Sequence, residues 1–263
     1  MNGNGTSSPG ANLSFTKFLF VRPASDDDAA RARLRAVGGV VGRGFFNDFE
    51  TQEGRDTPPH EAIQFLMHED GTGKTGVAGA RYALQVSSKY RPRLQETEQE
   101  LRRRLSGHAE IVALDGAVRA PQYTSAEMHA YAFKRAMPRG SGRVQRNVII
   151  IPIRKTAEWW QKDALDRHTY FYPHCDASTG APVKGHARAA EAGISTIYRK
   201  LYYNPEGTGR GEEWDFITYF ECADEHLPVF DQICGALRDA RQNPEWRFVV
   251  EGPEWRGRRV QKW

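Results

Sequence analysis

The sequence is poor in cysteine and has no long apolar run. Its three cysteines, Cys175, Cys222 and Cys234, form no C-x-x-C pair, so a zinc ribbon or a thioredoxin-type motif is unsupported. An odd, sparse set of cysteines is typical of a reducing compartment. No stretch approaches the roughly 20 apolar residues that cross a bilayer. Residues 1–14 are rich in Gly, Ser and Asn and lack the apolar segment of a secretory signal.

These absences predict a cytoplasmic protein with no membrane association and a disordered leader at residues 1–14. A periplasmic mature form whose signal has been removed is the alternative.

A strong charge of one sign is also absent. The formal net charge is +4, with 39% hydrophobic and 27% charged residues, as is ordinary for a globular protein. The densest basic run, Arg102–Arg104, lies among glutamates, whereas a nucleic-acid binder more often shows a basic stripe interleaved with aromatic residues. We therefore expect no nucleic-acid partner, although a weak positive field can help to attract a small anion.

Several short patterns resemble enzyme motifs but are incomplete. Gly71–Thr75 (GTGKT) lacks the first glycine of a phosphate-binding loop, since His68 stands at that position. Gly207–Gly211 (GTGRG) is better explained as a hairpin loop between two strands. The segment His168–Asp176 (HTYFYPHCD) lacks a second ligand group at a recognised metal-site spacing. We expect no function from these three segments.

Apolar alternation and helix-start signals predict two successive β-α-β-β-α-β units. In the first half we expect strands at 15–21, 62–67, 81–86 and 109–118 and helices at 26–37 and 89–105. In the second half we expect strands at 148–153, 194–203, 214–221 and 247–250 and helices at 157–167 and 227–241. This order indicates an α+β fold with two ferredoxin-like halves. The Gly-, Ser- and Arg-rich segment 137–146 separates them, giving an N-terminal half at 15–140 and a C-terminal half at 141–263.

Three motifs in the C-terminal half resemble the chlorite dismutase family. They are Asn147–Trp160 (NVIIIPIRKTAEWW), Tyr198–Tyr202 (YRKLY) and Asp215–Glu221 (DFITYFE). In the first half only Pro121–Tyr123 (PQY) matches, and faintly. The resemblance implies that the two halves form a dimeric α+β barrel with one b-type haem in the C-terminal half. It also implies a homo-oligomer, either a pentamer or a dimer, with the pentamer favoured.

The resemblance assigns two residues to the haem iron. The family's proximal histidine lies thirteen residues before its distal arginine, and counting back from Arg199 reaches His186. His186 would then ligate the iron, while Arg199 would act as the catalytic residue on the open side. The sequence agrees, because 185–193 (GHARAAEAG) is Ala-rich and favours a helix. Arg199 shares a strand face with apolar residues, which is costly unless the arginine meets an anion, a partner or water.

Four more residues are implied to contact the haem. Lys155 would meet a propionate, Trp159 and Trp160 would line the cavity or a subunit contact, and Tyr123 would border the haem. From the residues alone, the tryptophan pair is equally compatible with an ordinary core.

The chain departs from the family in two places. Residues 169–184 form an insertion that typical members lack. The family's proximal histidine donates a hydrogen bond to a glutamate, but counting from Phe230 places Gln242 there; Asp239 and Glu245 are the alternatives. An amide would make the imidazole less anionic than a carboxylate does.

The function implied is the conversion of chlorite, a small anion, to chloride and dioxygen. Arg199 would hold the intermediate hypochlorite by charge-assisted hydrogen bonding until it recombines. Two other functions stay open. One is a haem peroxidase-type or biosynthetic oxidoreductase on the same fold, although coproheme decarboxylases lack an arginine at this position. The other is a haem-binding protein without turnover.

Overall fold

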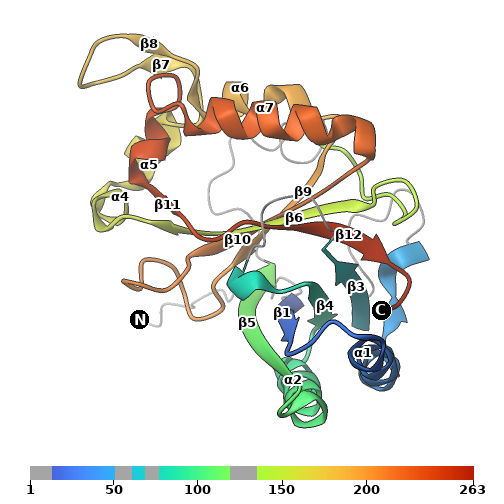
Figure 1. Ribbon diagram of the computed structural model, residues 1–263. Helices are drawn as coiled ribbons and strands as arrows, with labels where there is room; N and C mark the ends of the chain where they lie inside the picture. The colour runs from blue at the N-terminus through green and yellow to red at the C-terminus, as the bar shows by residue number, and fades with distance from the viewer. Residues whose placement is uncertain (1–13, 51–60, 69–76, 119–134) are drawn as a thin grey trace, which may run out of the picture.

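The computed structural model describes residues 14–50, 61–68, 77–118 and 135–263 (Figure 1). The main elements of the first half are β1 (Ser14–Pro23), α1 (Asp28–Val41), β3 (Glu61–Met67), β4 (Tyr82–Ser88), α2 (Arg91–Leu105) and β5 (Ala109–Val118). Those of the second half are β6 (Asn147–Lys155), α4 (Ala157–Gln161), α5 (Ala164–Thr169), α6 (Gly185–Ala189), β9 (Tyr198–Tyr203), β10 (Phe216–Cys222), α7 (Leu227–Arg238), β11 (Val249–Glu251) and β12 (Trp255–Val260).

The long strands close into a barrel. They form a 10-stranded sheet with the main order β10-β9-β5-β1-β4-β3-β12-β6-β11. Off this path β2 (Phe46–Asn47) pairs with β3, and β10 also pairs with β6. The ring contains one run from each half, β5-β1-β4-β3 and β12-β6-β10-β9. In each run the first strand of the half (β1 or β6) lies between the last strand (β5 or β12) and the third strand (β4 or β10). That is the arrangement of a ferredoxin-like β-α-β-β-α-β unit. The predicted α+β fold of two such halves in one barrel is confirmed.

The barrel has an apolar, aromatic interior and helices on its outside. Alternation along β6 shows both faces, since Val148 and Ile150 point into the barrel whereas Ile149 and Ile151 pack under α7. Burial on both faces explains why this strand is a continuous apolar run. In the first half α1 and α2 cover the outer face, and in the second half α6 and α7 do so (Figure 1). The buried aromatic residues of the interior are Phe18, Phe20, Tyr198, Tyr202, Tyr219 and Trp255.

Several predicted elements differ from the structure. The helix expected at 157–167 is broken into α4 and α5, because Lys162 is extended and Asp163 caps α5 by accepting from the amide of Asp166 at 2.8 Å. The strand expected from residue 194 begins at Tyr198, because residues 194–196 form a turn after η4 (Glu191–Gly193), and the amide of Ile197 donates to the carbonyl of Gly193 at 2.9 Å. The expected last strand corresponds to β11, and β12 was not predicted.

The predicted segment boundaries can be located relative to the strands. β1 begins at Ser14, the last residue of the expected leader, while residues 1–13 lie outside the described residues. The boundary placed at 140/141 falls between β5 and β6. The loop Gly207–Gly211 joins β9 to β10, as expected of a hairpin loop, and the segment Gly71–Thr75 lies outside the described residues.

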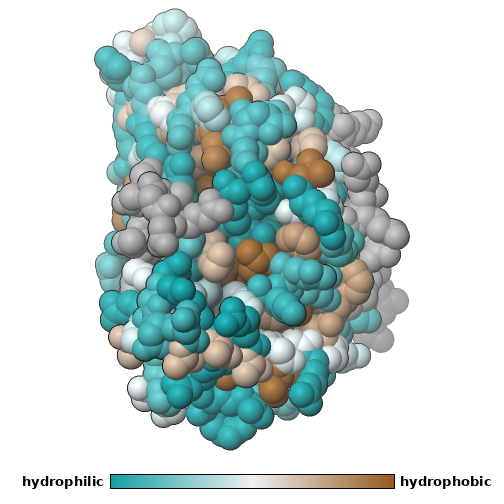
Figure 2. Space-filling model, turned by 45° about the vertical axis from the view of Figure 1, so that its right-hand side comes forward, coloured by the Kyte–Doolittle hydropathy of each residue, from teal (hydrophilic) through white to brown (hydrophobic). Residues whose placement is uncertain are grey.

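The insertion forms a small hairpin at one end of the molecule. Its strands β7 (His174–Cys175) and β8 (Pro182–Val183) pair with each other and project beside α5 (Figure 1). The face shown in Figure 2 is mostly hydrophilic, and its hydrophobic residues lie in small separate patches. None of the described helices is long and apolar enough to span a membrane.

Candidate functional site

His186 lies in the first turn of α6, directly after the insertion. The backbone before it is fixed by Gly185, whose φ of +69° favours glycine. A Cβ at Gly185 would also come within 2.4 Å of the carbonyl oxygen of Tyr172. The amide of His186 donates to the carbonyl of Tyr170 at 3.0 Å, and the amide of Lys184 donates to the carbonyl of Gln242 at 2.9 Å. The backbone therefore determines the direction in which the imidazole leaves the chain.

The imidazole of His186 is paired with a buried carboxylate. Its Nδ1 lies 2.9 Å from Oε2 of Glu245, and the side chain of Glu245 is 14% exposed. A carboxylate partner favours the tautomer with the proton on Nδ1, which leaves the lone pair of Nε2 for a metal. The histidine side chain is 31% exposed, and none of the described residues hydrogen-bonds to its Nε2. This is the arrangement that an axial haem ligand requires.

Lys155 completes a relay of three side chains. Its Nζ lies 2.5 Å from Oε1 of Glu245 and 4.2 Å from the ring centre of Trp159, and its side chain is 8% exposed. Burial alone would raise the pKa of Glu245, but Lys155 and His186 more than offset it and hold that pKa well below its usual range. The carboxylate is therefore ionised and accepts from both partners.

The relay selects one of the three alternatives for the partner of His186. Glu245 is the hydrogen-bond partner. Gln242 contacts this region through its backbone carbonyl, which accepts from Lys184 and Gly185. Asp239 forms an ion pair with Arg241 at 3.2 Å. The sequence named Glu245 as an alternative but could not choose it, because the choice depends on where α7 ends.

Arg199 lies on the outer, helix-covered face of the sheet. Its neighbours Tyr198 and Tyr202 point into the barrel, so alternation directs Arg199 outward. Arg199 is half-buried and stands opposite Phe220, which stands opposite Ile149 of β6. Phe220 and Ile149 pack in the cluster that also holds Phe230 of α7 and Ala187 of α6. The strand of Arg199 and the helix of His186 thus border the same apolar layer.

The two tryptophans have different environments. Trp159 is buried and packs against Phe248 and Tyr170, with ring centres 5.7 and 5.5 Å away. It lies under Lys155 in the core of the protomer, so it is not available as an anchor between subunits. Trp160 is half-buried and donates from Nε1 to Asp215 at 3.2 Å.

Two expected haem contacts, those of Lys155 and Tyr123, stay predictions. Lys155 was assigned to a propionate, and that contact stays a prediction, although the structure gives its ammonium group Glu245 as a partner. Tyr123 lies outside the described residues. Across the described part of the chain, no group of three or more His, Cys, Asp or Glu side chains is placed to hold a metal ion.

Sequence reasoning missed one neighbour of His186. The ring of Phe171 lies parallel to the imidazole, at 16° and with ring centres 6.0 Å apart. Phe171 belongs to the insertion, for which the resemblance offers no template. Its place in the aromatic run Tyr170–Tyr172 was the only signal available.

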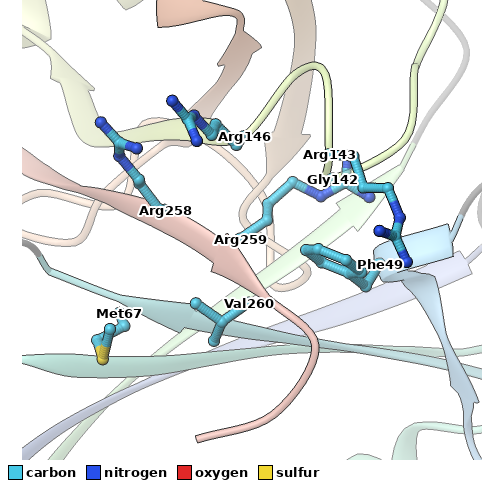
Figure 3. Close-up of a pocket in the computed structure, with 8 residues that line it drawn as sticks. All are labelled: Phe49, Met67, Gly142, Arg143, Arg146, Arg258, Arg259 and Val260. Carbon is cyan, nitrogen blue, oxygen red and sulfur yellow. The ribbon is translucent and has the colours of Figure 1, made fainter.

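A cavity of about 390 Å³ opens elsewhere, between the segment 142–146 and β12. Figure 3 shows arginines around it, and Arg143, Arg146 and Arg258 form ion pairs with Glu50 or Asp224. None of the residues of the His186 relay lines this cavity, so it does not belong to the site described above.

Solved structures resemble this chain over nearly its whole length, whereas no family model matches it. A chlorite dismutase from Candidatus Nitrospira defluvii, solved in complex with imidazole, is 20% identical, with a TM-score of 0.67 over 96% of this chain and 92% of that one. A second structure, described as a candidate chlorite dismutase, is 13% identical, with a TM-score of 0.59 over 94% of this chain and 95% of that one. The chain thus has the fold of the chlorite dismutases.

Proposed function

We propose that this protein is a haem-dependent oxidoreductase that converts chlorite to chloride and dioxygen. The observation that carries the proposal is the relay His186–Glu245–Lys155, placed beside the apolar layer that Arg199 borders. The fold likeness supports it, because the solved structures that share this fold include a chlorite dismutase from Candidatus Nitrospira defluvii.

The residues present suit a b-type haem. His186 offers Nε2 as a ligand atom, and the charge of its partner Glu245 is balanced by Lys155. The outer face of the sheet beside Arg199 carries apolar side chains that are not fully covered: Leu201 is 39% exposed, and Ile153 and Phe216 are half-buried. A porphyrin ring would cover such a face and remove it from water. When bound, the haem would supply the redox chemistry.

The chain's own residues would orient and retain the reactants. His186 would bind the iron through Nε2, with its Nδ1–H donating to Glu245. Arg199 would bind the chlorite anion through charge-assisted hydrogen bonds. The same guanidinium would keep the hypochlorite formed from chlorite in the site until turnover is complete, which is catalysis by proximity.

The substitution Arg199→Ala tests this role. The variant should keep its haem, because the iron would be held by His186 and not by Arg199. It should bind chlorite more weakly, since a hydrogen bond to a charged group contributes about 1.5–3 kcal/mol, and it should release more hypochlorite. An oxygen electrode follows turnover, and a chlorination-sensitive dye traps hypochlorite.

Arg210→Ala is the matched control, because Arg210 is an exposed arginine in the loop between β9 and β10, paired with Glu213. Oxygen release by Arg199→Ala at the wild-type rate, without extra chlorinated dye, would remove Arg199 from the mechanism. Haem binding by the wild type without oxygen release from chlorite would favour the peroxidase-type or non-catalytic alternatives.

A further inference from the structure

The insertion contacts His186 from several sides. The carbonyls of Tyr170 and Phe171 accept from the amides of His186 and Ala187, each at 3.0 Å. The ring of Phe171 lies parallel to the imidazole. A ring stacked on the imidazole face restricts rotation about the χ2 bond, yet it leaves Nε2 open because that atom points along the ring plane.

The turn of the same hairpin forms an ion pair with the segment that carries Glu245. Oδ2 of Asp176 forms an ion pair with Nη1 of Arg247 at 3.0 Å, and the side chain of Asp176 is 4% exposed. Arg247 belongs to η6 (Pro244–Phe248), two residues after Glu245. Arg247 also donates to Oγ of Ser178 at 3.2 Å.

The turn that presents Asp176 is itself well defined. Oδ1 of Asp176 accepts from the amides of Ser178 and Thr179 at 2.8 and 3.1 Å. The amide of Gly180 donates to the carbonyl of Asp176 at 2.7 Å. Since one oxygen closes the turn and the other meets Arg247, the ion pair joins two ordered segments.

We propose that the insertion 169–184 positions His186 and its partner Glu245. Phe171 sets the plane of the His186 imidazole. The ion pair between Asp176 and Arg247 holds η6 in place, so that Glu245 accepts the hydrogen bond from Nδ1 of His186. This inference rests on the proposed haem function. Phe171 and Arg247 are positioning residues, because they act through His186 and Glu245. A well-aligned carboxylate makes the imidazole more anionic, which strengthens the iron–nitrogen bond and stabilises ferric over ferrous iron.

The test compares Phe171→Leu and Arg247→Gln with the wild type and with Glu245→Gln as a reference. Arg247 is 41% exposed, so its replacement should not disturb folding. Each variant is loaded with haem, and three quantities are measured: the iron–imidazole stretching frequency of the ferrous form, the reduction potential, and the rate of haem transfer to excess apomyoglobin.

Glu245→Gln should lower the stretching frequency, raise the potential and weaken haem retention on the order of 10–100-fold. Phe171→Leu and Arg247→Gln should shift all three quantities in the same direction by a smaller amount. The matched controls are Phe15→Leu, which is partly buried against the core of the first half, and Arg241→Gln, which is exposed and paired with Asp239. Both control variants should match the wild type in stretching frequency, reduction potential and rate of haem transfer.

The two claims fail in different ways. If Glu245→Gln shifts the three quantities while Phe171→Leu and Arg247→Gln match the wild type, the insertion does not position the site and only this inference is wrong. If the wild type binds no haem, the proposed function fails and this inference fails with it. Equal losses of thermal stability in the variants and controls, without spectroscopic shifts, would also contradict a positioning role.

Discussion

The side chain of Glu245 stays ionised although it is largely buried, because Lys155 and His186 both form hydrogen bonds with it. Removing one member of a buried ion pair leaves the other charge uncompensated, which costs about 3–5 kcal/mol. We expect Lys155→Met to lose about this much free energy of unfolding in urea titrations of the haem-free protein. In the double variant Lys155→Met/Glu245→Met much of the loss should be recovered. A loss below about 1 kcal/mol in Lys155→Met would contradict the relay.

Asp224 provides a pH-dependent contribution to stability. Hydrogen bonds from Arg146 and Asn147 lower its pKa from 3.8 to about 2. Because the pKa is depressed in the folded protein, the stabilisation is complete above about pH 4 and is lost as the pH falls towards 2. Asp224→Asn should therefore melt at a lower temperature than the wild type at pH 7, with the difference shrinking from pH 4 to pH 2. A difference that stays constant over this range would rule out the ionised carboxylate as its source.

At the residue scale, the spacing to Arg199 identified His186 as the candidate ligand, but the sequence could not identify its partner. The expected helix at 227–241 would have placed Gln242 just after its end. In the structure α7 ends at Arg238, and Asp239 is extended with ψ of 90°. This earlier end redirects the chain, so Glu245 reaches the imidazole instead.

At the element scale, β12 shows why one strand of the barrel was missed. Its sequence WRGRRV contains three arginines, and charged residues usually indicate a solvent-exposed segment. Arg259 is nevertheless only 3% exposed, because it donates to Glu221 at 3.1 Å and to the carbonyl of Gly140 at 2.8 Å. Because the acidic partner of Arg259 lies on a strand distant in the sequence, the local hydrophobic pattern of β12 does not indicate that this arginine is buried.

Gly257 is required where β12 meets β3. A Cβ there would lie 2.6 Å from the backbone oxygen of Met67 and 2.3 Å from the ring of Trp255. Gly257→Ala should destabilise the protein by about 1–3 kcal/mol or more, since overpacking of a closed core has this cost. Urea titration measures the change.

Gly235→Ala is the matched control for this prediction. Gly235 lies within α7, and nothing is found within 4 Å of a Cβ placed there. Alanine should stabilise the helix by about 0.5–1 kcal/mol, so the two identical substitutions should have opposite signs. Equal effects would show that the seam between β12 and β3 is looser than described.

At the scale of the whole molecule, a buried ionic network connects the segment between the halves to the barrel. Arg139, only 1% exposed, donates to Glu221, Asp48 and Gln64, and Arg259 also contacts Glu221. Glu221 belongs to β10 of the second half, whereas Asp48 and Gln64 belong to the first. The order of elements predicted the two halves, but these interactions between them depend on closure of the barrel.

We also propose a closed homo-oligomer, with a pentamer favoured. Trp159 cannot anchor it, because this residue packs inside the protomer. Light scattering coupled to gel filtration at micromolar concentration should give a mass that is a whole multiple of 29.7 kDa, and a pentamer would give five times that value. A clean monomer would contradict the assembly without affecting the proposed haem site.

The central claim is that His186 holds a haem iron, and haem titration of the purified protein tests it most directly. The wild type should bind one haem per chain, with an axial-imidazole signature in the ferrous resonance Raman spectrum. His186→Ala should lose the haem or hold it loosely, whereas His168→Ala, a nearby histidine outside the relay, should bind like the wild type. A Soret band of normal intensity and an unchanged axial-imidazole signature in His186→Ala would contradict the account.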